Sequence, residues 1–485
     1  MENPKLKKLL DEWLEEATIK EMQEKLSSGD LTSKELVFMY LHRIAAFDNG
    51  INSILEINPD ALQIAAALDA ERSVSGSRSL LHGIPILIKD NIDTKDKMHT
   101  SAGSMALKDS FALRDSFVAE QLRKAGAVIL GKTNMTEWAN FMAIGMKNGY
   151  SSRGGQVLNP YGPFDVGGSS SGSGAAIAAN FAAAAVGTET SGSILYPSCL
   201  NSLVGIKPTV GLISRRGIIP IAHTQDTAGP MARTVEDAAI LLNVLNGLDE
   251  EDPITRINSL AEIDFTKHLL KDGLKGKRIG IAWDGFIDAI REDQREVIVA
   301  AVNVLKSSGA DVIENIVIPS AKADWKYHVL TYEFKPDLNA YLNGLHQSVP
   351  VRTLADLIEF NKNNEEQMLK YGQAVLLESE ETSGSLTEEA YFKALEYDDY
   401  HSKQQGIDYA LETYQLDAIV FPGEEGSFLS AKAGFPTIAV PAGYTTEGEP
   451  VGITFAGTAF SEPGLIELAY AFEQMTLFRK PPVLE

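Results

Sequence analysis

Residues 166–194 read VGGSSSGSGAAIAANFAAAAVGTETSGSI, an alanine-rich run with glycines and serines on both sides. Segments rich in glycine and serine most often form flexible linkers. Three functional hypotheses compete with that interpretation: a phosphate-binding loop, a nucleophile elbow, and a serine that is activated by a lysine base. The residues around the segment distinguish these hypotheses and indicate the fold class.

The first two hypotheses lack the partners that their chemistry needs. A phosphate-binding loop requires Lys-Ser or Lys-Thr at the start of the next helix, and no lysine follows the segment before Lys207. Residues 168–172 match the elbow pattern G-x-S-x-G with Ser170 as nucleophile, but residues 162–165 make a poor preceding strand. The histidines available as a base also lack a convincing catalytic context: His223, His346 and His401.

The third hypothesis has a candidate base in Lys89, which ends the apolar run at residues 84–88. A serine hydroxyl is a weak nucleophile until a base takes its proton. Burial disfavours the charged form of a lysine, so a buried lysine can act as that base. An ordinary surface lysine at the end of a strand remains the alternative for Lys89.

Alternating apolar runs and helical patterns predict an α/β fold. Strands are expected at 84–88 and 127–134, on either side of a helix at 117–125. Alanine favours helices, so a helix is also expected at 175–185. Further along the chain we expect strands at 204–206 and 212–213, a helix at 234–245, and three strands within 416–423, 435–443 and 450–457.

No clear linker divides the chain, so we expect a single large domain. Its expected parts are an N-terminal helical segment at 1–60 that packs on the core, and a main domain at 61–485. The long, acidic, helical composition near 320–400 indicates a helical insert within the main domain.

Composition limits the classes of partner. The net charge of -23 would repel nucleic-acid backbones, and the single cysteine, Cys199, allows neither a disulfide framework nor a thiolate zinc site. The N-terminus lacks the apolar core of a signal peptide, and the apolar segment 175–186 is too short to span a bilayer. We therefore expect no nucleic-acid or membrane partner and a cytoplasmic location.

Several motifs together resemble the amidase signature family: GIPILIKDNIDT, GSSSGSG, GTETSGSI and GIKPTVGLISRRGIIPIAHTQDTAGPMARTVEDA. They occur in the family's order, and the resemblance extends over about residues 81–476. It implies a large mixed central sheet that is covered by helices on both faces. Segments outside the signature, among them TSAGSMAL, GKTNMTEWANF and AFSEPGLIELAYAFEQ, are similar to bacterial peptide amidases, which release ammonia from C-terminally amidated peptides.

The resemblance implies a Ser–cis-Ser–Lys triad. Carried over by motif, Ser193 is the nucleophile, Ser169 is the bridging serine after a cis Gly168–Ser169 bond, and Lys89 is the base. Ser170 resembles a hydrogen-bond partner beside the family site. The expected oxyanion hole consists of the backbone N–H groups of Thr190, Ser191, Gly192 and Ser193, and the family needs no metal or organic cofactor.

Two departures from the family bear on the substrate. Leu195 stands where much of the family has an arginine, and the segment 421–433, near the substrate pocket in the family, is short for a peptide amidase. Peptide amides are the expected substrates, with other small, aryl or fatty amides as alternatives. The remaining alternatives are the amidase-like subunit of a tRNA-dependent amidotransferase and a binding protein without activity. Asp226 is expected to hold its own loop, and Cys199 to serve in packing.

Overall fold

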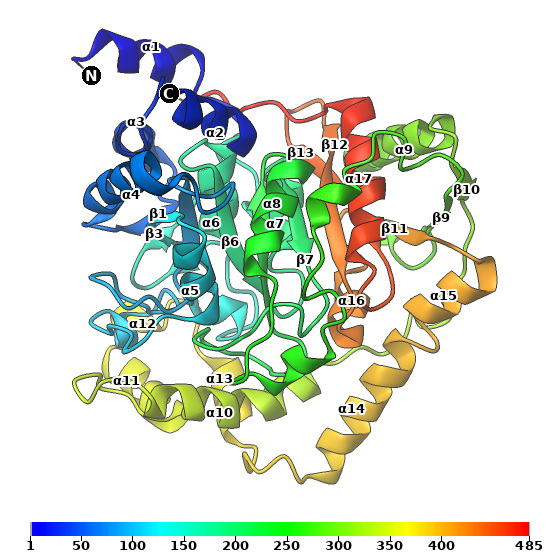
Figure 1. Ribbon diagram of the computed structural model, residues 1–485. Helices are drawn as coiled ribbons and strands as arrows, with labels where there is room; N and C mark the ends of the chain where they lie inside the picture. The colour runs from blue at the N-terminus through cyan, green and yellow to red at the C-terminus, as the bar shows by residue number, and fades with distance from the viewer. Residues whose placement is uncertain (1, 485) are drawn as a thin grey trace.

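The apolar runs pair into one mixed sheet of eleven strands in a computed structural model that describes residues 2–484 (Figure 1). β2 lies between β3 and β6 and is parallel to both, whereas β6 is antiparallel to β8. In order across the sheet the strands are β1 (Ile54–Ile57), β3 (Val128–Thr133), β2 (Pro85–Lys89), β6 (Ala184–Glu189), β8 (Thr227–Ala232), β7 (Val204–Lys207), β12 (Thr437–Tyr444), β13 (Pro450–Ala456), β11 (Ala418–Pro422), β9 (Arg278–Ile281) and β10 (Asp311–Ile313).

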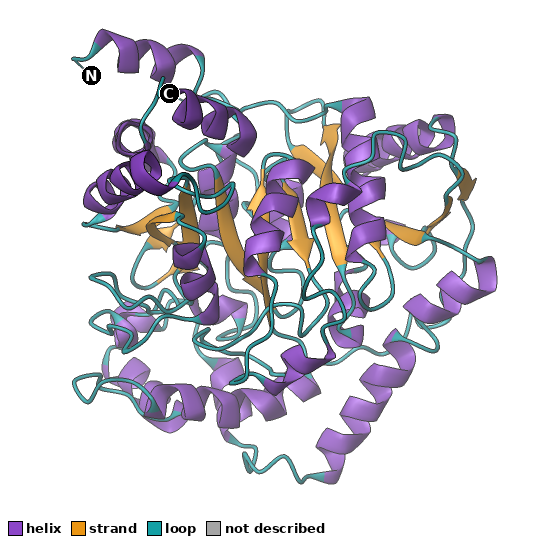
Figure 2. Ribbon diagram, in the orientation of Figure 1, coloured by secondary structure: helices purple, strands orange, loops and turns teal. Residues whose placement is uncertain are grey.

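Helices cover both faces of this sheet, as Figure 2 shows and as the resemblance implies. Successive side chains of a strand point to opposite faces of the sheet, so two residues of β13 an odd number of positions apart identify the helical layer on each face. Phe455 meets Phe472 of α17 (Glu462–Thr476) with ring centroids 6.1 Å apart. Gly452 faces the other way, where an added Cβ would lie 2.5 Å from Sγ of Cys199 in α7 (Leu195–Leu200). The predicted fold class is therefore confirmed, and Cys199 is buried in packing as expected.

Other helices extend these two layers. The predicted helices at 117–125 and 234–245 are confirmed as α5 (Phe117–Lys124) and α8 (Val235–Leu245). α8 and α9 (Glu292–Ser307) both contact α17, while α6 (Ser171–Ala178) contacts α7. The short helices α15 (Ile407–Tyr414) and α16 (Ser427–Ala433) flank β11 in the chain. Within residues 2–484, no helix is long and apolar enough to cross a bilayer.

The single helix predicted at 175–185 is wrong in its second half. α6 ends at Ala178, and the following alanines enter β6 at the centre of the sheet. Asn180 makes the break with φ 60°. Its side chain is tied to Glu16, donating to Oε1 at 2.8 Å and accepting the backbone N–H at 2.9 Å. Tertiary contacts therefore override the helix propensity of alanine.

The strand predicted at 212–213 is a turn. The N–H of Leu212 bonds locally to the carbonyl of Thr209 at 2.9 Å, and its own carbonyl accepts from the Asn258 side chain at 3.2 Å. Both Leu212 and Ile213 are buried, so the apolar run reflects burial in the core, which an irregular segment satisfies as well as a strand does.

The N-terminal segment packs its helices into the main core. These helices are α1 (Pro4–Glu12), α2 (Ile19–Ser28) and α3 (Ser33–Phe47), and α4 (Ala61–Ser75) follows them. Residues 1–60 are not purely helical, however, because β1 forms the outer strand beside β3. All four residues of β1, ILEI, are half-buried. Since three of the four are apolar, the sequence lacks the alternation of apolar and polar residues that would predict a strand.

Five helices between residues 328 and 402 are here called the helical cap: α10 (His328–Asn343), α11 (Leu354–Asn363), α12 (Glu365–Met368), α13 (Ala374–Glu380) and α14 (Glu389–Ser402). All of them except α12 contribute side chains to a second hydrophobic core. Phe334 of α10 meets Phe141 of the main domain with ring centroids 5.0 Å apart. Figure 1 shows α10, α11 and α13 of the helical cap below the sheet, and α14 leading from there up to α15.

Candidate active site

Lys89 is the last residue of β2 and is completely buried. Because β2 is paired on both sides, its final side chain enters the protein interior instead of solvent. The Nζ atom lies near four oxygens: Oγ of Ser169 at 2.7 Å, Oγ of Ser170 at 2.9 Å, Oγ1 of Thr188 at 2.9 Å and the Thr188 carbonyl at 3.2 Å. The amine is thus surrounded by hydroxyl groups and forms no ion pair among residues 2–484.

Burial lowers the pKa of Lys89 from 10.5 to about 7, because a charged amine is poorly solvated there. The negative charges of Glu189 and Asp226 oppose this shift but are smaller in effect. A substantial share of Lys89 is therefore uncharged near neutral pH and able to accept a proton.

The glycine-rich loop brings Ser169 to Lys89. The Gly168–Ser169 peptide bond is cis, and the Ser169 carbonyl accepts the N–H of Thr136 at 3.1 Å. Gly167 has φ 70°, and a Cβ there would lie 2.6 Å from the Cα of Pro197. Glycine is thus required where this loop passes against α7, and the segment is a fixed loop within the core instead of a linker.

Ser193 lies after β6 and lines a cavity of about 580 Å³. Its carbonyl accepts the N–H of Ser170 at 3.2 Å, which joins the two serine loops. The Ser193 hydroxyl itself has no hydrogen-bond partner within residues 2–484, so the expected contact with Ser169 is not formed. The structure therefore brings Lys89, Ser169 and Ser170 into direct contact and places Ser193 beside them at the cavity wall.

Glu189, which the sequence analysis did not single out, holds the turn before Ser193. Its buried carboxylate accepts the N–H of Gly192 at 2.7 Å, of Ile194 at 2.7 Å and of Leu195 at 3.1 Å. The Gly192 N–H is therefore already engaged, and we remove Gly192 from the expected oxyanion hole. The sequence contained one signal for this role of Glu189: it is an acidic residue four positions before a serine, at a turn that contains glycine.

The other three expected oxyanion donors are free. The N–H groups of Thr190, Ser191 and Ser193 have no partner within the described chain, and all three residues line the cavity. The Thr190 hydroxyl donates to Oδ1 of Asp226 at 2.5 Å. Asp226 also accepts backbone N–H groups from residues 221 and 222 at 2.8 and 3.0 Å, as its expected local role requires.

The elbow hypothesis finds no support in the contacts of Ser170. Its hydroxyl lies by Lys89 and donates to the Thr188 carbonyl at 3.1 Å, and no histidine of the described residues bonds to it. His223 bonds instead to Asp337 at 2.9 Å, beside Glu333. These three are the one group in residues 2–484 with the proximity of metal ligands, and each already has a protein partner: His223 and Asp337 bond to each other, while Glu333 accepts from Thr224 and Tyr391.

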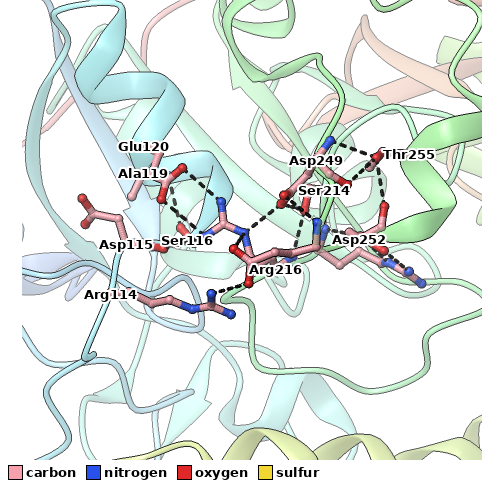
Figure 3. A network of polar contacts seen from close by, with 12 residues as sticks. Arg114, Asp115, Ser116, Ala119, Glu120, Ser214, Arg216, Asp249, Asp252 and Thr255 are labelled. Atoms are coloured by element: carbon pink, nitrogen blue, oxygen red, sulfur yellow. Dashed lines mark hydrogen bonds and ion pairs between the residues drawn. The ribbon is translucent and has the colours of Figure 1, made fainter.

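A second cavity of about 410 Å³ shares Ala139, Thr190 and Ile221 with the first. Its wall includes Thr188, which contacts Lys89. Its arginines are already paired: Figure 3 shows Arg216 between Glu120 and Asp249, at 3.0 and 2.8 Å. The cavity that holds Ser193 is therefore the better candidate for the substrate.

A family model described as Amidase matches residues 35–466. The chain belongs to this family and is a hydrolase that acts on amide C–N bonds. It is 43% identical to a probable amidase of Arabidopsis thaliana, over 97% of this chain and 92% of the relative. The peptide amidase of Stenotrophomonas maltophilia has a similar structure, with a TM-score of 0.91 and 44% identity over 97% of this chain and 99% of that one. A glutamyl-tRNA(Gln) amidotransferase subunit of Halorhodospira halophila is 32% identical over 96% of this chain and 99% of its own length.

Proposed function

We propose that this protein releases ammonia from carboxamides, with C-terminal peptide amides as substrates. The observation that carries the proposal is the buried amine of Lys89, 2.7 Å from Oγ of Ser169 and next to the cavity that Ser193 lines. Similarity to a peptide amidase over nearly the whole chain supports the substrate class.

In the proposed mechanism, neutral Lys89 accepts a proton from Ser169, which takes the proton of Ser193. The Ser193 oxygen then bonds to the amide carbon and forms a tetrahedral oxyanion. Ser169 passes its proton to the amide nitrogen as the C–N bond breaks and regains one from Lys89, so that ammonia leaves an acyl-enzyme on Ser193 and a neutral Lys89. Water cleaves this ester through the same relay. The Ser193–Ser169 contact must close when substrate binds, as catalytic hydrogen bonds often do.

The oxyanion would be stabilised by the free N–H groups of Thr190, Ser191 and Ser193. Removing one such donor typically lowers kcat by about 100- to 1,000-fold. Glu189 contributes by fixing the turn from which these groups project, although it does not touch the substrate.

Ammonia release from N-acetylated amino-acid amides and amidated dipeptides tests the proposal. Ser193→Ala should remove both turnover and labelling by a fluorophosphonate, which requires an activated serine. Ser307→Ala, on the exposed last turn of α9, is the matched control and should retain both. Full turnover by Ser193→Ala would refute the assigned nucleophile.

The similarity to the amidotransferase protein of Halorhodospira halophila favours a second candidate, in which the chain works only inside a larger assembly. The purified chain distinguishes the two. Hydrolysis of peptide amides by this chain alone supports the first proposal, whereas activity that appears only with companion proteins supports the second.

A further inference from the structure

The cavity that holds Ser193 has an acidic wall. Three glutamates line it: Glu378 from α13, and Glu424 and Glu425 from the loop between β11 and α16. Within the described residues, its lining includes no lysine, arginine or histidine. A substrate in this cavity therefore meets three carboxyl groups with no protein cation among the residues that line it.

Main-chain hydrogen bonds fix the loop that carries Glu424 and Glu425. The N–H of Gly423 donates to the Gly452 carbonyl at 3.2 Å, and the N–H of Ser427 donates to the Glu424 carbonyl at 2.7 Å. Gly426 lies against a ring, since a Cβ there would be 2.3 Å from Cγ of Phe421. Both glutamates are half-buried and are presented on a rigid turn.

Neither carboxyl group of the pair is satisfied by the protein. Among residues 2–484, no ion pair or side-chain hydrogen bond reaches Glu424 or Glu425, although Arg291 lines the adjoining cavity and pairs with Glu449. Other acids near the nucleophile, such as Glu189 and Asp226, accept several hydrogen bonds. Burial, followed by the charge of Glu425, raises the pKa of Glu424 to about 8. The ionised form of the pair is therefore unfavourable without a positive group, and a cation in the cavity would stabilise that form.

The wall of the cavity also has an apolar part, which includes Phe141, Ile144, Met146, Leu330 and Val375. An aliphatic stem with a charged tip suits this combination, because the stem can lie along apolar side chains while the tip meets a carboxylate.

We propose that Glu424 and Glu425 select amides whose acyl part carries an ammonium or guanidinium group. This inference rests on the proposed amide hydrolysis and names its substrate class more narrowly. A cation completes the acidic wall, whereas a neutral substrate of the same shape leaves it unpaired and an acidic substrate is repelled.

The test compares N-acetyl-lysinamide with N-acetyl-norleucinamide, which has a similar aliphatic stem without the ammonium. The wild-type protein should have a kcat/KM about tenfold or more higher for the lysine amide, the size expected for a charge-assisted hydrogen bond. In the double variant Glu424→Gln, Glu425→Gln this ratio should fall towards one, with the norleucine amide little affected. Glu447→Gln, on an exposed turn, removes the same kind of charge elsewhere and should keep the ratio.

A second measurement separates this inference from the proposed function. The two amides are titrated calorimetrically into Ser193→Ala, where binding is read without turnover. Tighter binding of the lysine amide, lost in the glutamine double variant, supports the acidic wall even if another activity is found. Equal affinities, or a preference that survives the double substitution, would overturn it; absence of any amide hydrolysis would overturn the proposed function alone.

Discussion

Replacing Glu189 by glutamine tests whether its carboxylate organises the turn before Ser193. The substitution keeps the shape of the side chain but leaves one acceptor oxygen and adds an NH₂ donor. Three backbone N–H groups now share the carboxylate, one on Oε1 and two on Oε2. Whichever way the amide is oriented, the NH₂ group faces at least one N–H group that had been bonded.

The magnitude follows from that count. A buried donor left unpaired costs about 1–3 kcal/mol, and the remaining bonds lose the extra strength of a charged acceptor. We expect the free energy of unfolding to fall by about 2–4 kcal/mol on these grounds. The favoured orientation keeps the two bonds on the Ile194 side and frees Gly192, which adjoins Ser193. Displaced oxyanion donors should then lower kcat by about 100-fold.

Glu462→Gln is the matched control. Glu462 is also buried and, like Glu189, lies near the amine of Lys207. It accepts one backbone N–H, from Thr209 at 2.7 Å, and its second oxygen has no partner in the described chain. A glutamine oxygen can keep that single bond, so we expect a loss of about 1 kcal/mol or less and an unchanged kcat.

Urea unfolding and ammonia release, measured on both variants, complete the experiment. If Glu189→Gln retained the wild-type kcat and unfolding midpoint, the three hydrogen bonds would not be what holds the turn. An equal loss in Glu462→Gln would instead assign the effect to the charge near Lys207.

Three further outcomes are expected. Lys89→Met should lower kcat by about 100- to 10,000-fold if the amine is the general base, and an active variant would contradict this. Since the pKa of Lys89 is lowered to about 7, the wild-type kcat/KM should rise with pH through this value as the amine loses its proton; a profile flat from pH 6 to 8 would count against the assignment. Gly172→Ala should destabilise the protein by about 1–3 kcal/mol or more, because the added Cβ would lie 2.2 Å from the Asn134 carbonyl oxygen. The matched control Gly464→Ala places its Cβ in open space and should stabilise α17 by about 0.5–1 kcal/mol. Thermal unfolding measures both effects.

The sequence predicted those parts of the fold in which local pattern and burial agree. The apolar run before Lys89 became β2, and the three C-terminal runs became β11, β12 and β13 of the same sheet. The alanines after Ala178 misled the prediction because their propensity is helical while their position, between β2 and β8, is the middle of the sheet. The position of a segment within a sheet depends on distant partners, which a local pattern does not contain.

The site shows a similar division. The order of the motifs indicated Lys89, Ser169 and Ser193 as site residues, but the motifs do not predict the direction in which an individual backbone N–H group points. Whether a backbone N–H faces the cavity or a carboxylate depends on the path of the turn, which is why Gly192 was misassigned and Glu189 was missed. The acidic wall could likewise not be predicted from the sequence, because two adjacent glutamates in a loop are usually solvated. Their position in the wall of the cavity is known only from the structure.

The parallel pairing of β2 with β6 also has a consequence for how activity is acquired. Lys89 and Thr188 touch although 99 residues separate them in the chain. Contacts of such long range form late and slowly, because closing a large loop is entropically unfavourable before the strands dock. Recovered turnover after dilution from denaturant therefore reports that the middle of the sheet is assembled, whereas the early return of a helical circular-dichroism signal reports only local order.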